Sequence, residues 1–186
     1  MSRAAVFMDR DGVINRAFVR DGIPHPPDSV DGLEILPRVP EALGSLRAHG
    51  FALVVITNQP DVARGTCSRE CVEDIHHRLE RELPLDAIFT CFHDSADGCG
   101  CRKPRPGLLL KAAQALDIDL FSSFMIGDRS SDMEAGWRAG CSTLFVDEGY
   151  AEAQPLHFDF RVRSLLEASK IILRGEGAPA RMSGSS

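Results

Sequence analysis

Short apolar runs alternate with amphipathic stretches along most of this chain. The clearest run, Phe51–Thr57, is apolar up to its last residue, which is typical of a strand buried on both faces of a parallel sheet. Shorter runs predict further strands at Ala4–Met8, Ala87–Thr90, Phe124–Ile126 and Thr143–Val146. Helical spacing predicts helices at Pro37–His49, after Ser68, at Gly107–Leu116 and at Asp132–Ala139. This alternation predicts an α/β fold, a Rossmann-like parallel sheet with helices on both faces.

The remaining segments predict loops and a single domain. Arg16–Asp31 holds several prolines and glycines without a clear period, so we expect a loop there. The 186 residues fit one domain, which we place at residues 1–174. Residues 175–186 are small and polar and predict a disordered tail. The segments between Gly12 and Thr57 and between Thr57 and Lys103 are each too short to contain a large cap domain.

Charge and hydropathy exclude some classes of partner. The formal net charge of −6 argues against general nucleic-acid binding, which usually needs a basic excess. Phe51–Ile56, the longest clear apolar run, is far too short to span a membrane, which takes about 18 residues. Charged residues interrupt the segment where a signal peptide would need its apolar core. We therefore expect a cytoplasmic protein, whose six cysteines are free or metal-bound rather than disulfide-linked.

Acidic residues follow the first predicted strand directly. Asp9 and Asp11 are separated by one residue, and Gly12 comes next. In open parallel sheets, ligands bind at the carboxyl ends of the strands. There, one carboxylate can attack a phosphorus atom while the other transfers a proton, and a glycine lets the backbone approach a phosphate. Taken alone, the stretch is equally compatible with an ordinary turn.

Three further segments carry polar groups to the same sheet edge. Thr57, Asn58 and Gln59 end the second strand, Arg102 and Lys103 precede the next helix, and Asp128 and Asp132 follow the fourth strand. Each group has an ordinary explanation, such as a solvated cation pair or a turn carboxylate. Their joint placement suits phosphoryl transfer, which needs an in-line nucleophile and neutralised phosphoryl oxygens. Crowded carboxylates also predict a hard cation such as Mg²⁺ among them.

Four metal-ligand residues lie within a short stretch after the third strand. Cys91, His93, Cys99 and Cys101 supply three thiolates and one imidazole, a set that forms tetrahedral zinc sites. Because all four positions are protein ligands, we expect a structural zinc loop that holds Arg102 and Lys103 in place. Free thiols with a surface histidine are the alternative. Cys141 is expected to be packed, and Cys67 and Cys71 have no assigned role.

These motifs resemble the haloacid dehalogenase superfamily of phosphohydrolases. The matching residues are Asp9-Arg10-Asp11-Gly12, Thr57, Lys103, and Gly127-Asp128 with Asp132. The resemblance implies that Asp9 is the nucleophile, Asp11 the general acid and base, and Thr57 and Lys103 phosphoryl contacts. It also implies that Asp9, the backbone carbonyl of Asp11, and Asp128 bind Mg²⁺, with Asp132 in support. The substrate is expected to contact Arg10, Asn58, Gln59 and Arg102 as well.

The zinc loop resembles that of two groups within the superfamily. These are the D-glycero-D-manno-heptose 1,7-bisphosphate phosphatases and the phosphatase domain of histidinol-phosphate phosphatases. Ala63-Arg64-Gly65 is similar to the heptose group, which implies removal of the C7 phosphate from the sugar bisphosphate. Pro60-Asp61 and Arg16–Arg20 depart from that group's pattern, so histidinol phosphate or another small phosphorylated sugar stays an alternative. A non-catalytic, zinc-stabilised interaction module is a more distant one, and a monomer is expected.

Overall fold

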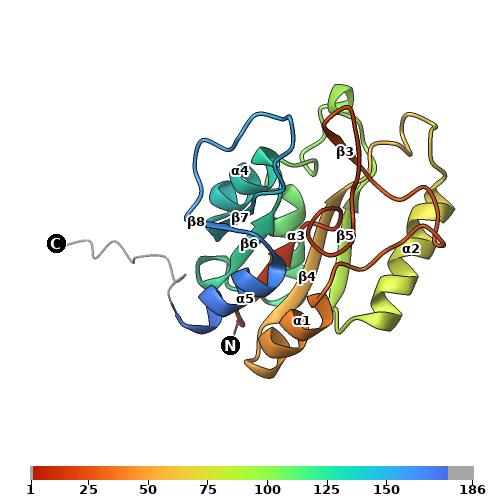
Figure 1. Cartoon of the computed structure of the whole chain (residues 1–186). Coiled ribbons are helices and arrows are strands. Elements are labelled where there is room, and N and C mark those ends of the chain that lie inside the picture. The colour runs from red at the N-terminus through yellow and green to blue at the C-terminus, as the bar shows by residue number, and fades with distance from the viewer. Residues whose placement is uncertain (1, 176–186) are drawn as a thin grey trace.

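A parallel six-stranded sheet forms the centre of the molecule (Figure 1). The computed structural model describes residues 2–175. Its strands have the order β5-β4-β1-β6-β7-β8, and every neighbouring pair is parallel. Their bounds are β1 Ala5–Met8, β4 Ala52–Asn58, β5 Ala87–Cys91, β6 Phe124–Gly127, β7 Ser142–Val146 and β8 Phe160–Val162. The predicted fold class is confirmed.

Helices cover both faces of the sheet. One face carries α1 (Val39–Ala48), α2 (Arg69–Glu82) and α5 (Leu165–Leu173), and the other carries α3 (Gly107–Leu116) and α4 (Ser130–Ala139). The alternation within β1 shows why: Val6 and Met8 pack toward the first face, while Ala5 and Phe7 pack toward the second. Two apolar cores, one on each face, therefore fix the central strands.

The three strands that carry the predicted motifs are neighbours. β1 lies between β4 and β6, with Phe7 opposite Val54 on one side and Met125 on the other. Because all three strands run in the same direction, their carboxyl ends meet at one edge, and the loops that follow them share a site.

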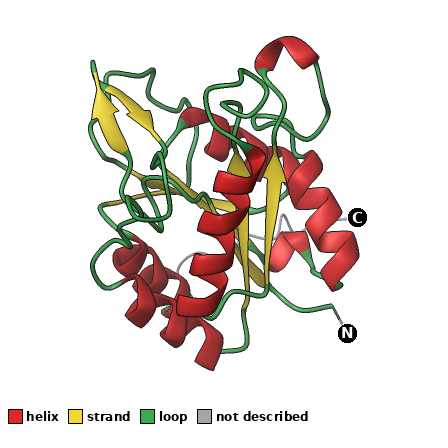
Figure 2. Ribbon diagram, turned by 90° about the vertical axis from the view of Figure 1, so that its right-hand side faces the viewer, coloured by secondary structure: helices red, strands yellow, loops and turns green. Residues whose placement is uncertain are grey.

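Two parts of the chain differ from the sequence-based expectation. The expected loop Arg16–Asp31 contains an antiparallel hairpin of β2 (Phe18–Arg20) and β3 (Ile23–His25). Its turn places Asp21 at φ 52° and Gly22 at φ 77°, a conformation that glycine and aspartate tolerate best. Pro24 within β3 masked this strand, because proline lowers the strand propensity of a segment unless it is an edge strand. The hairpin stands apart from the main sheet, at the end where the parallel strands finish (Figure 2).

The chain also continues regularly beyond Val146. The strand β8 and the helix α5 complete the sheet and cover its first face, and neither was expected from the sequence. The expected tail at 175–186 lies, apart from Gly175, outside the described residues. Within residues 2–175 no cap domain is inserted between the strands, and no helix is long and apolar enough to cross a bilayer.

Candidate active site

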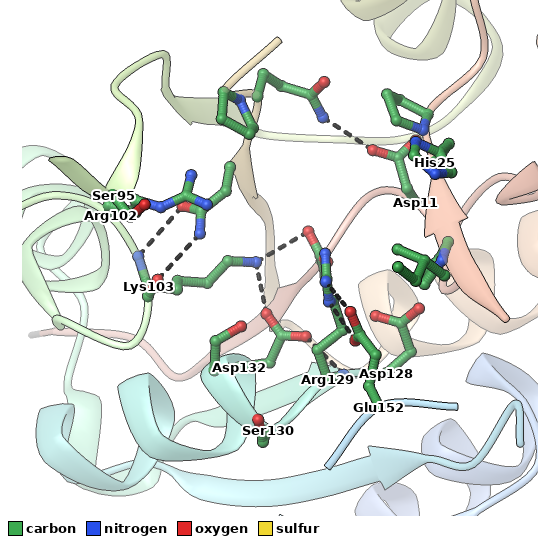
Figure 3. Close-up of a pocket in the computed structure, with 18 of the residues that line it drawn as sticks. Asp11, His25, Ser95, Arg102, Lys103, Asp128, Arg129, Ser130, Asp132 and Glu152 are labelled. Atoms are coloured by element: carbon green, nitrogen blue, oxygen red, sulfur yellow. Dashed lines mark hydrogen bonds and ion pairs between the residues drawn. The ribbon is translucent and has the colours of Figure 1, made fainter. Parts of the chain in front are cut away.

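The ends of β1, β4 and β6 line a cleft of about 650 Å³ (Figure 3). Lys103 lies in its floor, with Nζ 2.9 Å from Oδ1 of Asp9 and 2.6 Å from Oδ1 of Asp132. The same ammonium donates a hydrogen bond of 2.7 Å to the carbonyl oxygen of Ile56. All of these groups are buried, so one cation holds a carboxylate after β1 and a carboxylate in the first turn of α4 in a fixed arrangement.

Burial and neighbouring charges set the protonation of this cluster. Burial raises the pKa of Asp9 to about 6, against the lowering effect of Lys103, while Asp132 and Asp11 raise it further. Burial alone would lower the pKa of Lys103, but Asp132 and Asp9 outweigh it and hold the pKa above its usual value. Lys103 is therefore a permanent cation, and Asp9 depends on nearby positive charge to be an ionised nucleophile.

Asp128 supplies the strongest indication of a cation in the cleft. Asp9, Asp128 and Asp132 place carboxylate oxygens within 4.8 Å of one another. No hydrogen bond of good geometry from the described residues reaches either buried oxygen of Asp128, although the hydroxyl of Tyr150 lies beside it. Burial raises the pKa of Asp128, and the charges of Asp9 and Asp132 add to that effect. Three buried carboxylates with one lysine fit a hard divalent cation, for which oxygen ligands are suited.

Asp11 lies outside that carboxylate cluster and is held by three other side chains. Oδ1 accepts hydrogen bonds from Nε and Nη2 of Arg10, at 3.1 and 3.0 Å, and from Nδ2 of Asn15 at 2.9 Å. Oδ2 accepts from Nη2 of Arg10 at 3.0 Å and from Nε2 of Gln59 at 2.8 Å. The carboxylate still lines the cleft. This arrangement is compatible with proton transfer by the side chain of Asp11.

Two expected substrate contacts are placed differently from the sequence-based prediction. The side chain of Arg10 is fully buried and does not line the cleft, because its guanidinium pairs with Asp11 inside the protein. The structure therefore shows the side chain of Arg10 inside the protein, and its contact with substrate stays a prediction. Thr57 is also buried, and its hydroxyl accepts a hydrogen bond from Gln59 at 2.9 Å without lining the cleft. Asn58, Gln59 and Arg102 do line it.

The cleft walls include residues that motif reasoning did not identify. Ile23, Pro24 and His25 bring the β2–β3 hairpin to one side of the cleft. Arg129 and Glu152 form an ion pair on another side. The hairpin turn is fastened to the same region, because Ala151 donates a backbone hydrogen bond of 3.0 Å to the carbonyl oxygen of Gly22. These contacts join segments far apart in the sequence, and no local pattern announces them.

The four predicted zinc ligands converge in one place. Sγ of Cys101 lies 3.2 Å from Sγ of Cys91, 3.4 Å from Sγ of Cys99 and 3.3 Å from Nδ1 of His93. One ligand atom from each residue falls within a sphere suited to a single ion. Tetrahedral sulfur and nitrogen ligands at about 2.0–2.3 Å from a zinc ion lie roughly 3.5–3.8 Å apart. Sγ of Cys91 has this spacing to Nδ1 of His93 (3.6 Å) and to Sγ of Cys99 (3.7 Å), and the pairs with Cys101 are closer by a few tenths of an ångström. The donor set therefore fits zinc.

Hydrogen bonds connect this loop to the cleft. Arg102 donates to the carbonyl oxygen of His93 at 3.2 Å, and Arg105 donates to the carbonyl oxygens of Gly98 and Cys99. On the other side, Asn58 bonds Lys103 through both of its amide atoms, at 3.1 and 3.2 Å. The zinc-ligand loop and the end of β4 thus hold the backbone of Lys103 between them.

Comparison with known proteins agrees with this geometry. A family model described as HAD-hydrolase-like matches residues 100–168. The D-glycero-β-D-manno-heptose-1,7-bisphosphate 7-phosphatase of Escherichia coli strain K12 is 38% identical over 151 residues, which cover 75% of this chain and 76% of that protein. The chain belongs to the HAD-like phosphatase family. It is a phosphatase. The heptose-bisphosphate 7-phosphatase of Bordetella bronchiseptica is also similar, with 36% identity over 77% of this chain and 80% of that protein.

Solved structures of this phosphatase family share the fold. The crystal structure of D,D-heptose 1,7-bisphosphate phosphatase from B. bronchiseptica, in complex with magnesium and phosphate, has a TM-score of 0.77 and 29% identity, covering 92% of this chain and 99% of that one. A Mesorhizobium loti protein whose crystal structure is described as that of a HAD-like phosphatase by assignment has a TM-score of 0.73 and 28% identity, covering 97% of this chain and 90% of that one. Family membership favours the enzyme over the zinc-stabilised interaction module.

Proposed function

We propose that this phosphatase hydrolyses phosphomonoesters with Mg²⁺ through a covalent aspartyl-phosphate on Asp9. Its proposed reaction is removal of the C7 phosphate from D-glycero-D-manno-heptose 1,7-bisphosphate. The observation that carries the proposal is the buried contact of Lys103 with both Asp9 and Asp132 at the floor of the cleft. It provides an oriented carboxylate nucleophile next to a fixed cation, as in-line phosphoryl transfer requires.

The proposed reaction has two steps at the same residues. An oxygen of Asp9 attacks the phosphorus while the bond to the sugar oxygen breaks, and Asp11 gives its proton to that oxygen. A water then attacks the phosphorus, Asp11 takes a proton from the water, and the bond to Asp9 breaks to release inorganic phosphate. Lys103 keeps Asp9 ionised and oriented, and Asp132 orients Lys103.

We infer that Mg²⁺ is held by the carboxylates of Asp9 and Asp128 and by the backbone carbonyl of Asp11. Among the described residues, no hydrogen bond of good geometry reaches the buried oxygens of Asp128, and this supports the ligand set. When bound, the ion supplies positive charge that favours the ionised form of Asp9 and neutralises phosphoryl oxygens. We also infer that zinc bound by Cys91, His93, Cys99 and Cys101 stabilises the loop that carries Arg102 and Lys103.

Arg102 supports a bisphosphate over a substrate with one phosphate. Among the cleft arginines, Arg64 pairs with Asp94 and Arg129 pairs with Glu152. Arg102 forms no ion pair with the described residues and donates only to a backbone carbonyl. A planar, permanently charged donor without a carboxylate partner is suited to a distal phosphate group. The relatives named for the heptose bisphosphate agree with this choice.

The proposal is tested by phosphate release with and without Mg²⁺. Asp9→Asn should abolish turnover while the thermal melting curve stays close to that of the wild type, and retained activity would exclude Asp9 as nucleophile. Turnover of the heptose bisphosphate is then compared with that of histidinol phosphate. A preference for histidinol phosphate of more than about tenfold in kcat/KM, equal to 1.4 kcal/mol, would reverse the substrate assignment.

A cytoplasmic monomer acting on small phosphorylated molecules completes the proposal. All six cysteines are free in the structure, which is expected for a reducing compartment. Size-exclusion chromatography with light scattering measures the oligomeric state.

A further inference from the structure

Arg10 is an unusual residue for the interior of this protein. Its side chain has an exposed fraction of 0%, although arginine stays charged under all ordinary conditions. Its counter-charge is Asp11, with Nη2 3.0 Å from Oδ2. A buried cation needs its remaining N–H groups satisfied as well, and a second residue meets part of that need.

His76 on α2 is that second residue. Its Nε2 lies 3.0 Å from Nη1 of Arg10, and only 8% of the residue is exposed. Because guanidinium groups only donate hydrogen bonds, Nε2 must be the acceptor, so His76 is neutral with its proton on Nδ1. Burial, followed by the charge of Arg10, lowers the pKa of His76 to about 3, in agreement with this assignment.

The contact connects a covering helix to the edge of the sheet where the site lies. The neighbours of His76 on α2, Val72, Ile75 and Leu79, are buried, so the imidazole cannot leave without moving the helix. Nη1 of Arg10 is fixed by His76, while Nε and Nη2 of the same rigid plane face Asp11. The orientation of one end of the guanidinium therefore sets the orientation of the other.

We propose that His76 is a positioning residue of the phosphatase reaction: it fixes the plane of Arg10, and through Arg10 it holds the carboxylate of Asp11 toward the cleft. The inference rests on the proposed role of Asp11 as the general acid. Both oxygens of Asp11 accept from Arg10, and each accepts from one further side chain: Oδ1 from Asn15 and Oδ2 from Gln59. Because Gln59 lines the cleft, Oδ2 is the oxygen on the cleft side. Rotation of Arg10 would turn that oxygen away.

Two substrates with different leaving groups can show whether His76 positions Asp11 or only stabilises the fold. A sugar alkoxide is a poor leaving group and needs the proton of Asp11, whereas p-nitrophenolate leaves without one. A displaced Asp11 should therefore impair the sugar phosphate and spare p-nitrophenyl phosphate. The comparison uses kcat/KM, since this quantity reports the steps up to departure of the leaving group and not the later hydrolysis at Asp9.

The test compares His76→Leu with wild type on both substrates at saturating Mg²⁺. We expect kcat/KM for heptose 1,7-bisphosphate to fall about tenfold and that for p-nitrophenyl phosphate to change less than about twofold. His76→Gln should restore the loss, because its amide oxygen can accept from Nη1 near the position of Nε2. The control His77→Leu, on the exposed side of the same helix, should leave both substrates unchanged.

Three results would overturn the inference. They are equal losses on the two substrates, no loss on either, or no rescue by His76→Gln. Should His76→Leu not fold, His76→Asn replaces it, since its shorter side chain keeps a polar group but does not reach Arg10; the same selective loss is expected.

Asp11→Asn tests the underlying role separately. If Asp11→Asn loses about 100-fold on the sugar phosphate alone and the His76 variants show no such selective loss, only the positioning role of His76 is contradicted. If Asp11→Asn loses activity equally on both substrates, the role of Asp11 as general acid is contradicted.

Discussion

The ammonium nitrogen of Lys103 lies 2.9 Å from Oδ1 of Asp9, in a place where both side chains are almost completely buried. This contact joins the end of β1 to the segment after the zinc-ligand loop. It lowers the pKa of Asp9 against the effect of burial, so that one lysine controls the charge of the nucleophile. The same nitrogen reaches Asp132, which connects the first turn of α4, the helix after β6, to the pair.

Replacing Lys103 should therefore affect both activity and stability. In Lys103→Met, Asp9, Asp128 and Asp132 would share a buried site without their cation. We expect kcat/KM to fall by about 10²–10³-fold, since transferred charge loses a preorganised partner. The free energy of unfolding should fall by about 3 kcal/mol, measured by urea denaturation without added metal.

Lys111→Met is the matched control for this substitution. Lys111 lies on the exposed side of α3, so the same chemical change there should leave both quantities near the wild-type values. A Lys103→Met variant with wild-type kcat/KM would contradict the role of Lys103 in phosphoryl transfer. Full activity with lower stability would restrict the residue to a structural role.

Gly12 provides a steric test of the carboxylate arrangement. Its φ is +85°, and a Cβ atom built there would lie 1.9 Å from Oδ2 of Asp128. Gly12→Ala should displace Asp128 and lower kcat by at least about 100-fold, with an increased Mg²⁺ concentration for half-maximal activity. The assay is a Mg²⁺ titration of phosphate release.

Gly50→Ala separates the steric effect from backbone strain. Gly50 has a similar φ of +87°, but a Cβ there would meet nothing within 4 Å. Both variants carry the cost of a left-handed backbone with a side chain, about 1–2 kcal/mol. We expect only Gly12→Ala to lose activity. Equal loss in the two variants would show that strain, and not contact with Asp128, is responsible.

The sequence was sufficient to bring these residues to one place because they lie at or just after strand ends. Asp9, Thr57 and Asp128 each follow a continuous apolar run, and parallel topology brings such ends together. The convergence of the four proposed zinc ligands was equally predictable, since these four residues lie within one short segment of the chain. The burial of Arg10 was not accessible, because it depends on His76, a residue 66 positions later on another element.

The missed elements have comparable physical reasons. The apolar part of β8 is short and lies far from any motif, so nothing in the sequence distinguished this segment from a loop. Its pairing with β7 nevertheless makes it a strand. The hairpin of β2 and β3 is exposed and contains a proline, so neither burial nor propensity predicted it. Its position over the cleft depends on the contact of Gly22 with Ala151, which is a tertiary effect.

Removal of zinc should weaken stability and substrate binding together. Cys99→Ser removes one proposed ligand from the loop that positions Arg102 and Lys103. We expect about one zinc fewer per chain by elemental analysis, a lower melting temperature, and a higher KM for the bisphosphate. Cys67→Ser, outside the cluster, is the control and should retain zinc. A loss of turnover in Cys99→Ser with an unchanged melting temperature would contradict a structural role.

His76 also predicts how stability depends on pH. Burial and Arg10 lower its pKa to about 3 in the folded protein, against about 6.5 in the unfolded chain. Between these values the unfolded state binds the extra proton, so the free energy of unfolding decreases as pH falls. His76→Gln lacks this titration, and from pH 7 to pH 5 the wild type should therefore lose about 2 kcal/mol relative to the variant.

Urea denaturation at pH 7 and pH 5 measures this difference in the free energy of unfolding, and His77→Gln, at an exposed neighbouring position, should follow the wild type. A wild type and His76→Gln that lose stability in parallel would show that His76 accepts a proton inside the folded protein, which would contradict its role as the acceptor for Arg10.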